Sequence, residues 1–178
     1  MVQSLELILD DALDESVRRE WQMLLDADLP SQGRHTGSSN RPHITLSVAD
    51  EFDRLDARLE SETIESAFPV RLGALIVFRG RSVTLARSVV VSASLLELHS
   101  RVSELAQDAH GYRSHTRPGR WTPHVTIARR LTHTELFDAI RCLDSTPVDL
   151  DGTTSGLRRW DGERKIEWLV GEGRHQNR

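Results

Sequence analysis

An internal repeat constrains the fold of this chain more than any other feature. The segments 42–46 (PHITL) and 123–127 (PHVTI) share the pattern Pro-His-aliphatic-Thr-aliphatic, and their histidines lie 81 residues apart. The apolar positions of a helical pattern before each segment recur at the same offset: Val17, Trp21 and Leu24 in the first copy, and Leu98, Val102 and Leu105 in the second. The repeat is too long for a solenoid unit, so two copies predict one body with pseudo-twofold symmetry.

Hydrophobic patterning predicts a similar series of elements in each copy. Strands are expected at 2–9, 43–48, 69–78 and 124–129, in a hairpin partner over 82–93, near residue 147, and in a last hairpin that ends with IEWLV. Helices are expected at 14–28 with Asp14 as N-cap, at 52–62, from residue 94, and at 132–143. The fold class is therefore α+β, with two pseudo-symmetric lobes that enclose a central cleft. Each lobe is an antiparallel sheet with helices packed outside.

Length and charge limit how this fold is used. The 178 residues suit a single domain, expected over 1–178, with repeat units at about 1–87 and 88–173 and a tail at 174–178. The mean hydropathy of -0.43 excludes a membrane protein, and the start of the chain has no signal-peptide pattern. A net charge of -4 argues against broad coating of nucleic acid or lipid. Any bound anion must be held locally.

The number of cysteines indicates the redox state of the cellular compartment. Cys142 is the only cysteine, so an intramolecular disulfide is excluded and a reducing, cytoplasmic location is expected. Its helical neighbours are apolar, which favours packing over reactivity. No cofactor, membrane contact or obligatory protein partner is predicted.

The duplicated motif carries the chemistry. In a strand, a histidine and the threonine two residues later point to the same face, roughly 6 to 7 Å apart, while the aliphatic residues point to the buried face. Histidine can donate or accept a proton near neutral pH, and two of them suit in-line displacement at phosphorus. Threonine hydroxyls can donate to the non-bridging oxygens. The motifs lack the His-x-His or His-x-x-x-His spacing of metal sites, so no metal is expected.

The two motifs in register with a whole-chain repeat resemble the 2H phosphoesterase superfamily, in particular its bacterial 2'-5' RNA ligase-like branch of RNA 2',3'-cyclic phosphodiesterases. The resemblance implies metal-free hydrolysis of a cyclic phosphate and, in some members, 2'-5' joining of RNA ends. It implies that His43 and His124 are catalytic and that Thr45 and Thr126 bind the phosphate. It favours His124 as the base and His43 as the acid. Arg129 is a further expected anion contact, but it shares the face of Thr126 only if the strand bulges or ends.

Several residues near the motifs remain open to two interpretations. Arg41 and Trp121 are candidates for phosphate contact or base stacking at the mouth of the cleft, although Trp121 equally suits core packing. His35 and His115 precede the motifs, each as the dipeptide His-Thr in a loop. They are either a second ring of substrate contacts or polar loop residues.

Three functions fit the sequence. The first is hydrolysis of an RNA or nucleoside 2',3'-cyclic phosphate. The second is a small-molecule cyclic phosphodiesterase of the ADP-ribose cyclic phosphate type, which the acidic net charge favours. The third is a non-catalytic module that binds RNA or nucleotide, against which the intact histidines and threonines of both copies argue. The expected partner is an RNA end or a small cyclic nucleotide as substrate.

Overall fold

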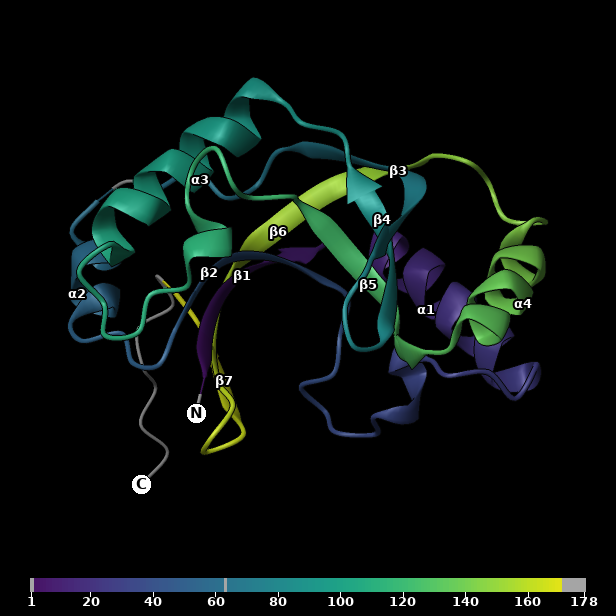
Figure 1. The fold of residues 1–178 in the computed structure, drawn as a ribbon. Helices are drawn as coiled ribbons and strands as arrows, with labels where there is room; N and C mark the ends of the chain where they lie inside the picture. Colours follow the sequence, from purple (N-terminus) through teal and green to yellow (C-terminus); the bar gives the residue numbers. More distant parts are fainter. Residues whose placement is uncertain (1, 63, 171–178) are drawn as a thin grey trace.

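The computed structural model describes residues 2–62 and 64–170 (Figure 1). In chain order its strands and helices are β1 (Gln3–Leu9), α1 (Asp11–Asp26), β2 (His43–Ala49), α2 (Leu55–Glu60), β3 (Pro69–Phe78), β4 (Val83–Val89), α3 (Ala93–Ala106), β5 (His124–Leu131), α4 (His133–Leu143), β6 (Leu150–Asp161) and β7 (Ile166–Leu169). Two short 3-10 turns, η1 (Gln32–Arg34) and η2 (Ser114–Thr116), lie in the loops before β2 and β5. The expected tail, 174–178, lies outside the described residues.

The order strand, helix, strand, helix, strand occurs twice. It runs from β1 to β3 and again from β4 to β6. His43 opens β2 and His124 opens β5, so the two motifs begin equivalent strands. The second series starts with β4, the hairpin partner of β3.

The strands of the described residues form one antiparallel sheet in the order β2-β1-β6-β3-β4-β5, with β7 paired to β6. This order is unchanged when each strand is exchanged with its equivalent in the other series. The third strand of each series therefore lies beside the first strand of the other: β6 beside β1, and β3 beside β4. The α+β prediction is confirmed. Instead of two separate sheets there is one, because β3 and β6 pair from Pro69 opposite Thr153 to Leu72 opposite Leu150.

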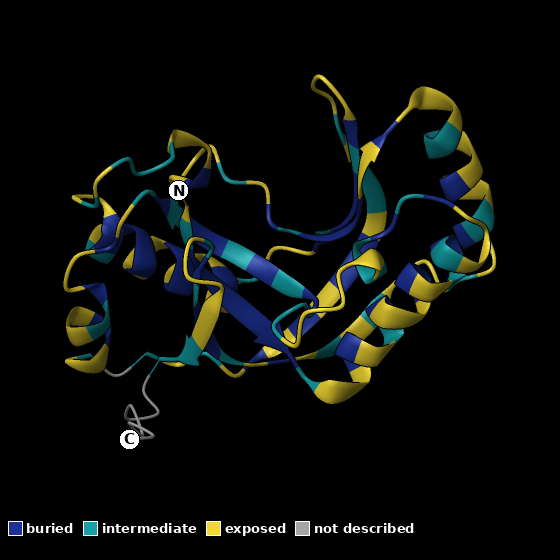
Figure 2. Ribbon diagram, turned by 90° about the horizontal axis from the view of Figure 1, so that it is seen from below, coloured by how far each residue is buried: buried dark blue, intermediate teal, exposed yellow. Residues whose placement is uncertain are grey.

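The helices form two groups on the sheet, α1 with α4 and α2 with α3 (Figure 1). Their exposed residues face outward and their buried residues face the strands (Figure 2). On α1 the buried positions include Val17, Trp21 and Leu24, as the helical spacing predicts. In the described part of the chain, no helix combines the length and the apolar composition needed to cross a bilayer.

The start of α1 differs from the prediction. Asp10, and not Asp14, is the N-cap: its Oδ1 accepts a 2.8 Å hydrogen bond from the backbone N–H of Leu13. The same carboxylate accepts a bond from the backbone N–H of Thr153. The helix begins directly after β1, so the aspartate that ends the strand is the one in capping position. Asp14 is buried one turn later and pairs with Arg18.

The second helix is also shorter than predicted. It begins at Leu55 because Arg54 has a left-handed backbone, with φ of 54°, and so breaks the helical path. Phe52 lies before the helix and is buried, with the guanidinium of Arg159 4.7 Å from its ring centroid. Phe52 therefore packs in the core before the helix begins, whereas the sequence pattern predicted it as part of the helix.

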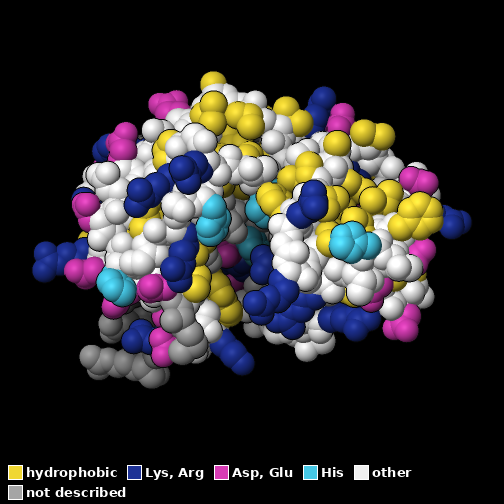
Figure 3. Space-filling view, in the orientation of Figure 1, with side chains coloured by type: hydrophobic (Ala, Val, Ile, Leu, Met, Phe, Trp, Pro, Cys, Tyr) yellow, Lys and Arg dark blue, Asp and Glu magenta, His cyan; other side chains and the backbone are white. Residues whose placement is uncertain are grey.

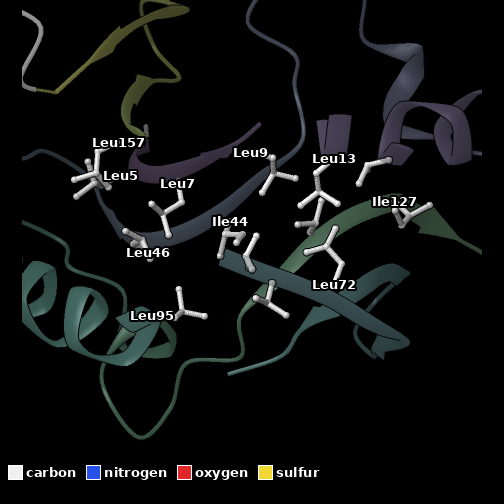
Figure 4. Close-up of a cluster of buried hydrophobic side chains, with 14 of the residues drawn as sticks. Leu5, Leu7, Leu9, Leu13, Ile44, Leu46, Leu72, Leu95, Ile127 and Leu157 are labelled. Atoms are coloured by element: carbon white, nitrogen blue, oxygen red, sulfur yellow. The ribbon is translucent and has the colours of Figure 1, made fainter. Parts of the chain in front are cut away.

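The core lies between the sheet and the helices. It includes Leu5, Leu7 and Leu9 of β1, Leu72 of β3 and Leu95 of α3 (Figure 4). The aliphatic residues of both motifs, Ile44 and Leu46, and Val125 and Ile127, are fully buried in it. Burial of these side chains fixes which face of each strand turns inward. The histidine and threonine of each motif therefore lie on the opposite face.

Candidate active site

The two motif histidines are held in the same way. His43 Nδ1 lies 2.8 Å from the backbone carbonyl of Arg41, and His124 Nδ1 lies 2.7 Å from the backbone carbonyl of Thr122. A carbonyl can only accept, so Nδ1 carries the hydrogen in both rings. In the neutral ring the basic nitrogen is then Nε2. Each histidine can take up or release a proton at Nε2 without breaking the bond that orients it.

A β-bulge follows the threonine of the first motif. Thr45 lies opposite Glu6 and Ser47 lies opposite Leu5, so Leu46 is an extra residue on β2. One extra residue moves the side-chain alternation by one position. The face that carries His43 and Thr45 therefore continues at Val48, which lines the cleft.

The second motif has the equivalent bulge. Thr126 lies opposite Ala86 and Ala128 lies opposite Leu85, so Ile127 is the extra residue on β5. By the same change of alternation, Arg129 follows Thr126 on one face. Arg129 is exposed and lines the cleft that also contains His43 and Thr45. The condition on which the Arg129 prediction depended, a bulged strand, is met.

The cleft has a volume of about 650 Å³. Residues of β1, β2, β5 and β6 and of the loop before β2 line it. The sequence-predicted residues that line it are His43, Thr45, Arg41 and Arg129. His35 of the preceding loop lines it too, together with Trp160 and Lys165. Figure 3 shows a hollow in the middle of this face, with histidine side chains and Lys or Arg side chains around it.

His124 and Thr126 lie beside this cleft and are not among the residues that line it. Thr126 is buried, with 8% of its surface exposed. The His124 ring centroid lies 4.5 Å from that of Phe78. Burial lowers the pKa of His124; the bond to the Thr122 carbonyl opposes this, and the charges of Arg129, His43 and His115 lower the pKa further. The charges of His43 and Arg129 therefore act on His124, and its lowered pKa favours the neutral form of the ring.

His43 has a different environment, which the sequence did not predict. Its Nε2 lies 3.5 Å from Oε1 of Glu6, a buried residue of β1. Glu6 is paired with Arg158 of β6, whose Nε lies 2.9 Å from Oε2. Ser4 donates a 2.6 Å hydrogen bond to Glu6 Oε1. The available signal was a glutamate inside an otherwise apolar strand pattern, 2–9, but its partner is 152 residues away in the sequence.

Arg158 also approaches the His43 ring, with Nη2 3.3 Å from Nδ1. Both groups are donors, because Nδ1 already gives its hydrogen to the Arg41 carbonyl. The approach is therefore a contact between a cation and the ring rather than a hydrogen bond. Arg158 Nη1 is held elsewhere, by the backbone carbonyl of Ser39 at 2.9 Å and by Glu167 Oε2 at 2.6 Å.

Two tryptophans hold the outer edges of the motif strands. Trp21 Nε1 donates a 3.0 Å hydrogen bond to the backbone carbonyl of Thr126, and Trp121 Nε1 donates one of 2.9 Å to that of Thr45. Each tryptophan belongs to the half of the chain opposite to its acceptor. Trp121 is also stacked on the buried His99, with ring centroids 3.7 Å apart and an angle of 6° between the planes. These contacts favour packing over base stacking for Trp121.

Arg41 lies at the edge of the cleft, close to α1. Arg41 Nε lies 3.6 Å from Asp14 Oδ2, which links the guanidinium to α1.

Within 2–62 and 64–170, no three His, Cys, Asp or Glu side chains gather in a way that could hold a metal ion. Another hollow, of about 550 Å³, lies where α2 meets the end of α3 and contains neither motif.

Known proteins resemble this chain both in sequence profile and in fold. A profile of the 2'-5' RNA ligase superfamily matches residues 10–164. No curated protein matches the sequence. The fold resembles E. coli LigT in apo form, at 13% identity over 95% of this chain and 94% of that chain, with a TM-score of 0.59. It also resembles E. coli LigT complexed with 3'-AMP, at 18% identity over 95% and 94%, with a TM-score of 0.57.

A third solved structure, TT0787 of Thermus thermophilus, gives 16% identity over 96% of this chain and 95% of that chain, with a TM-score of 0.55. At such identities the likeness concerns the fold. The superfamily profile, in contrast, spans both motifs and the elements between them. The chain therefore belongs to the 2'-5' RNA ligase superfamily, and its resemblance to the 2H phosphoesterases is confirmed.

Proposed function

We propose that the protein hydrolyses a cyclic phosphodiester, an RNA or nucleoside 2',3'-cyclic phosphate, by acid–base catalysis with His43 and His124. One observation carries the proposal: two histidines on equivalent strands have the same Nδ1 bond to the carbonyl two residues earlier. Each ring is thereby oriented to exchange a proton at Nε2. The pair also interacts electrostatically.

In this mechanism His124 Nε2 takes a proton from water, and the water oxygen attacks phosphorus. The bond from phosphorus to the leaving 2'- or 3'-oxygen breaks, and His43 Nε2 gives its proton to that oxygen. The lowered pKa of His124 suits a group that must accept a proton. Solvent then returns both histidines to their starting states. No cofactor takes part.

The groups that bind the phosphate are Thr45, Thr126 and Arg129. The threonine hydroxyls follow the histidines on the same face of each strand, and Arg129 reaches the cleft through the bulge after Thr126. Charge on the non-bridging oxygens grows in the transition state, where such donors stabilise it most. Arg41 at the cleft edge is a secondary anion contact. If a 5'-hydroxyl replaces water as the attacking group and the bond from phosphorus to the 3'-oxygen breaks, the same two proton transfers would give a 2'-5' linkage as a side reaction.

A small nucleotide is the second candidate substrate, of the ADP-ribose cyclic phosphate type. The cleft of about 650 Å³ has the size of a small-molecule site, and the net charge of -4 disfavours long RNA. Structures of E. coli LigT with 3'-AMP, with NADP+ and with ATP support nucleotides as the ligand class.

We further propose that the chain works as one cytoplasmic domain. Each half supplies one motif, and the third strand of each half pairs with the other half. Neither half would contain the proposed catalytic pair by itself. The single cysteine suits a reducing compartment.

The test is turnover of three substrates: a 2',3'-cyclic nucleotide, an oligonucleotide with a 2',3'-cyclic end, and an ADP-ribose cyclic phosphate. Wild type is expected to open at least one of them, and His43→Ala and His124→Ala are expected to lose at least about a hundred-fold in kcat, the contribution of general acid–base catalysis. His133→Ala, an exposed histidine at the start of α4, is the matched control. Binding without turnover by wild type would instead support the non-catalytic module.

A further inference from the structure

A buried carboxylate lies beside one histidine of the pair and not beside the other. Glu6 is 3% exposed, and its Oε1 is 3.5 Å from His43 Nε2. On β1, Glu6 lies opposite Thr45 on one side and opposite Arg158 on the other. Hydrogen bonds from Arg158 of β6 and from Ser4 of the same strand hold the carboxylate next to the nitrogen that exchanges the proton.

The equivalent positions in the second half are apolar. Ala86 of β4 lies opposite Thr126, as Glu6 lies opposite Thr45. On its other side Ala86 lies opposite Ile76 of β3, where β6 has Arg158. The two motifs are thus alike, but the residues opposite them on the neighbouring strands differ between the two halves. His43 therefore has a carboxylate beside it, whereas the equivalent position beside His124 is an alanine, and the charges that act on His124 are those of Arg129, His43 and His115.

Glu6 itself is not suited to supply the proton. Burial alone would raise its pKa, but the charges of His43 and Arg158 and the hydrogen bonds from Ser4 and Arg158 hold the pKa below its usual value. Glu6 is then a carboxylate at neutral pH. Its influence on the reaction must act through His43.

We propose that Glu6 is a positioning residue for the catalytic pair: its carboxylate, 3.5 Å from Nε2 of His43, favours a proton on that nitrogen, so that His43 is the proton donor and His124 the acceptor. This rests on the proposed function. Arg158 orients the Glu6 carboxylate and, through its own positive charge near the ring, limits the effect. The two histidines of the repeat thereby have opposite roles: His43 gives a proton to the leaving oxygen, and His124 takes one from water.

Other charged groups also face His43, and the test must allow for them. They come from the loop before β2, from β5, from β6 and from the turn that leads to β7: His35 and Arg41, His124 and Arg129, Arg158, and Lys165. None of these residues is altered in Glu6→Gln. Arg158 keeps its ion pair with Glu167, and Arg41 keeps its pair with Asp14. Removal of the Glu6 charge takes away the carboxylate next to Nε2, so a proton on that nitrogen of His43 is less stable.

The experiment compares Glu6→Gln with Glu20→Gln. Glu20 makes the matched buried ion pair, with Arg87, and both its side chain and that of Arg87 are 2% exposed. The first readout is titration of the His43 ring by NMR, which needs no substrate. The midpoint is expected to fall by about one pH unit in Glu6→Gln and to stay unchanged in Glu20→Gln. An unchanged midpoint in Glu6→Gln would overturn the proposal.

The second readout is the pH profile of kcat. The donor must be protonated, so the alkaline limb of Glu6→Gln is expected to move by about one pH unit to lower pH, with about a ten-fold loss of turnover beyond it. The acidic limb, which reports His124, should stay in place. A uniform fall in kcat with both limbs unmoved, equal to that of Glu20→Gln, would mean a purely structural role and contradict the proposal.

A reciprocal variant makes the test independent of the folding of one mutant. Arg158→Gln removes the positive charge near His43, so the His43 midpoint is expected to rise, opposite to Glu6→Gln. The same direction of shift in both variants would overturn the proposal. Should wild type turn over none of the substrates, the proposed function fails, and the NMR titrations still decide whether Glu6 holds the proton on His43.

Discussion

Trp121 Nε1 donates a 2.9 Å hydrogen bond to the backbone carbonyl of Thr45, across the boundary between the two halves of the chain. In the described part of the sheet β2 pairs with β1 alone, so this carbonyl lies on an outer strand edge. Trp121→Phe keeps most of the packing on His99 and removes the donor. We expect a loss of about 1 kcal/mol in the free energy of unfolding, measured by denaturant titration.

The same variant is expected to lower kcat, because Thr45 and His43 share the strand that the indole holds. The reciprocal variant Trp21→Phe, which frees the carbonyl of Thr126, should behave alike. A stability equal to that of wild type in both variants would show that these edge carbonyls do not need their indole donors.

The threonine hydroxyls are expected to matter in the transition state. Thr45→Val and Thr126→Val keep the shape of the side chain and remove the hydroxyl, so kcat/KM should fall by about a hundred-fold in each. Thr45→Ser and Thr126→Ser keep the hydroxyl and should retain most of the activity. Steady-state kinetics on the 2',3'-cyclic substrate checks this, and equal losses in the serine and valine variants would contradict a role for the hydroxyls.

The acidic limb of the pH profile should lie below the ordinary histidine pKa of 6.5. A base must be neutral to act, and a lowered pKa keeps His124 neutral to lower pH; activity is therefore retained as the pH falls past 6.5 and is lost at the lowered value. Arg129 contributes to this lowering. Arg129→Gln should move the acidic limb to higher pH, as seen in a kcat profile, and an acidic limb that moves to lower pH in this variant would count against the assignment.

Activity should not depend on a divalent metal. The proposed proton transfers use imidazole and hydroxyl groups alone, so dialysis against EDTA is expected to leave kcat unchanged. Turnover that disappears in EDTA and returns with zinc would contradict the mechanism. Metal analysis of the purified protein provides the control.

The sequence carries local information well. The motif strands, the buried face of α1 and the α+β class follow from side-chain periodicity, which depends on residues only a few positions apart. Asp14 is the wrong N-cap because spacing does not reveal that the helix begins directly after β1 at Asp10. The bulge after Thr126 adds one residue to a strand without any change in its composition, so the position of Arg129 could only be stated as a condition.

Contacts between distant segments could not be predicted in this way. Glu6 and Arg158 meet because β6 of the second half pairs with β1 of the first, a register that no local pattern encodes. A buried glutamate requires a partner, but the chain offers many arginines and the sequence does not say which one lies opposite. The two motifs could therefore be identified from the sequence, but the difference between the surroundings of His43 and His124 could not be predicted from it.

The exchanged third strands have a consequence for the origin of such a chain. A polypeptide with a single strand-helix-strand-helix-strand series could build the same symmetric sheet as a homodimer, each subunit lending its last strand to the other. A dimer of that kind has two identical histidines, and every mutation alters both. Two copies in one chain are free to diverge, and a glutamate at position 6 with an alanine at position 86 is a difference that a homodimer cannot hold.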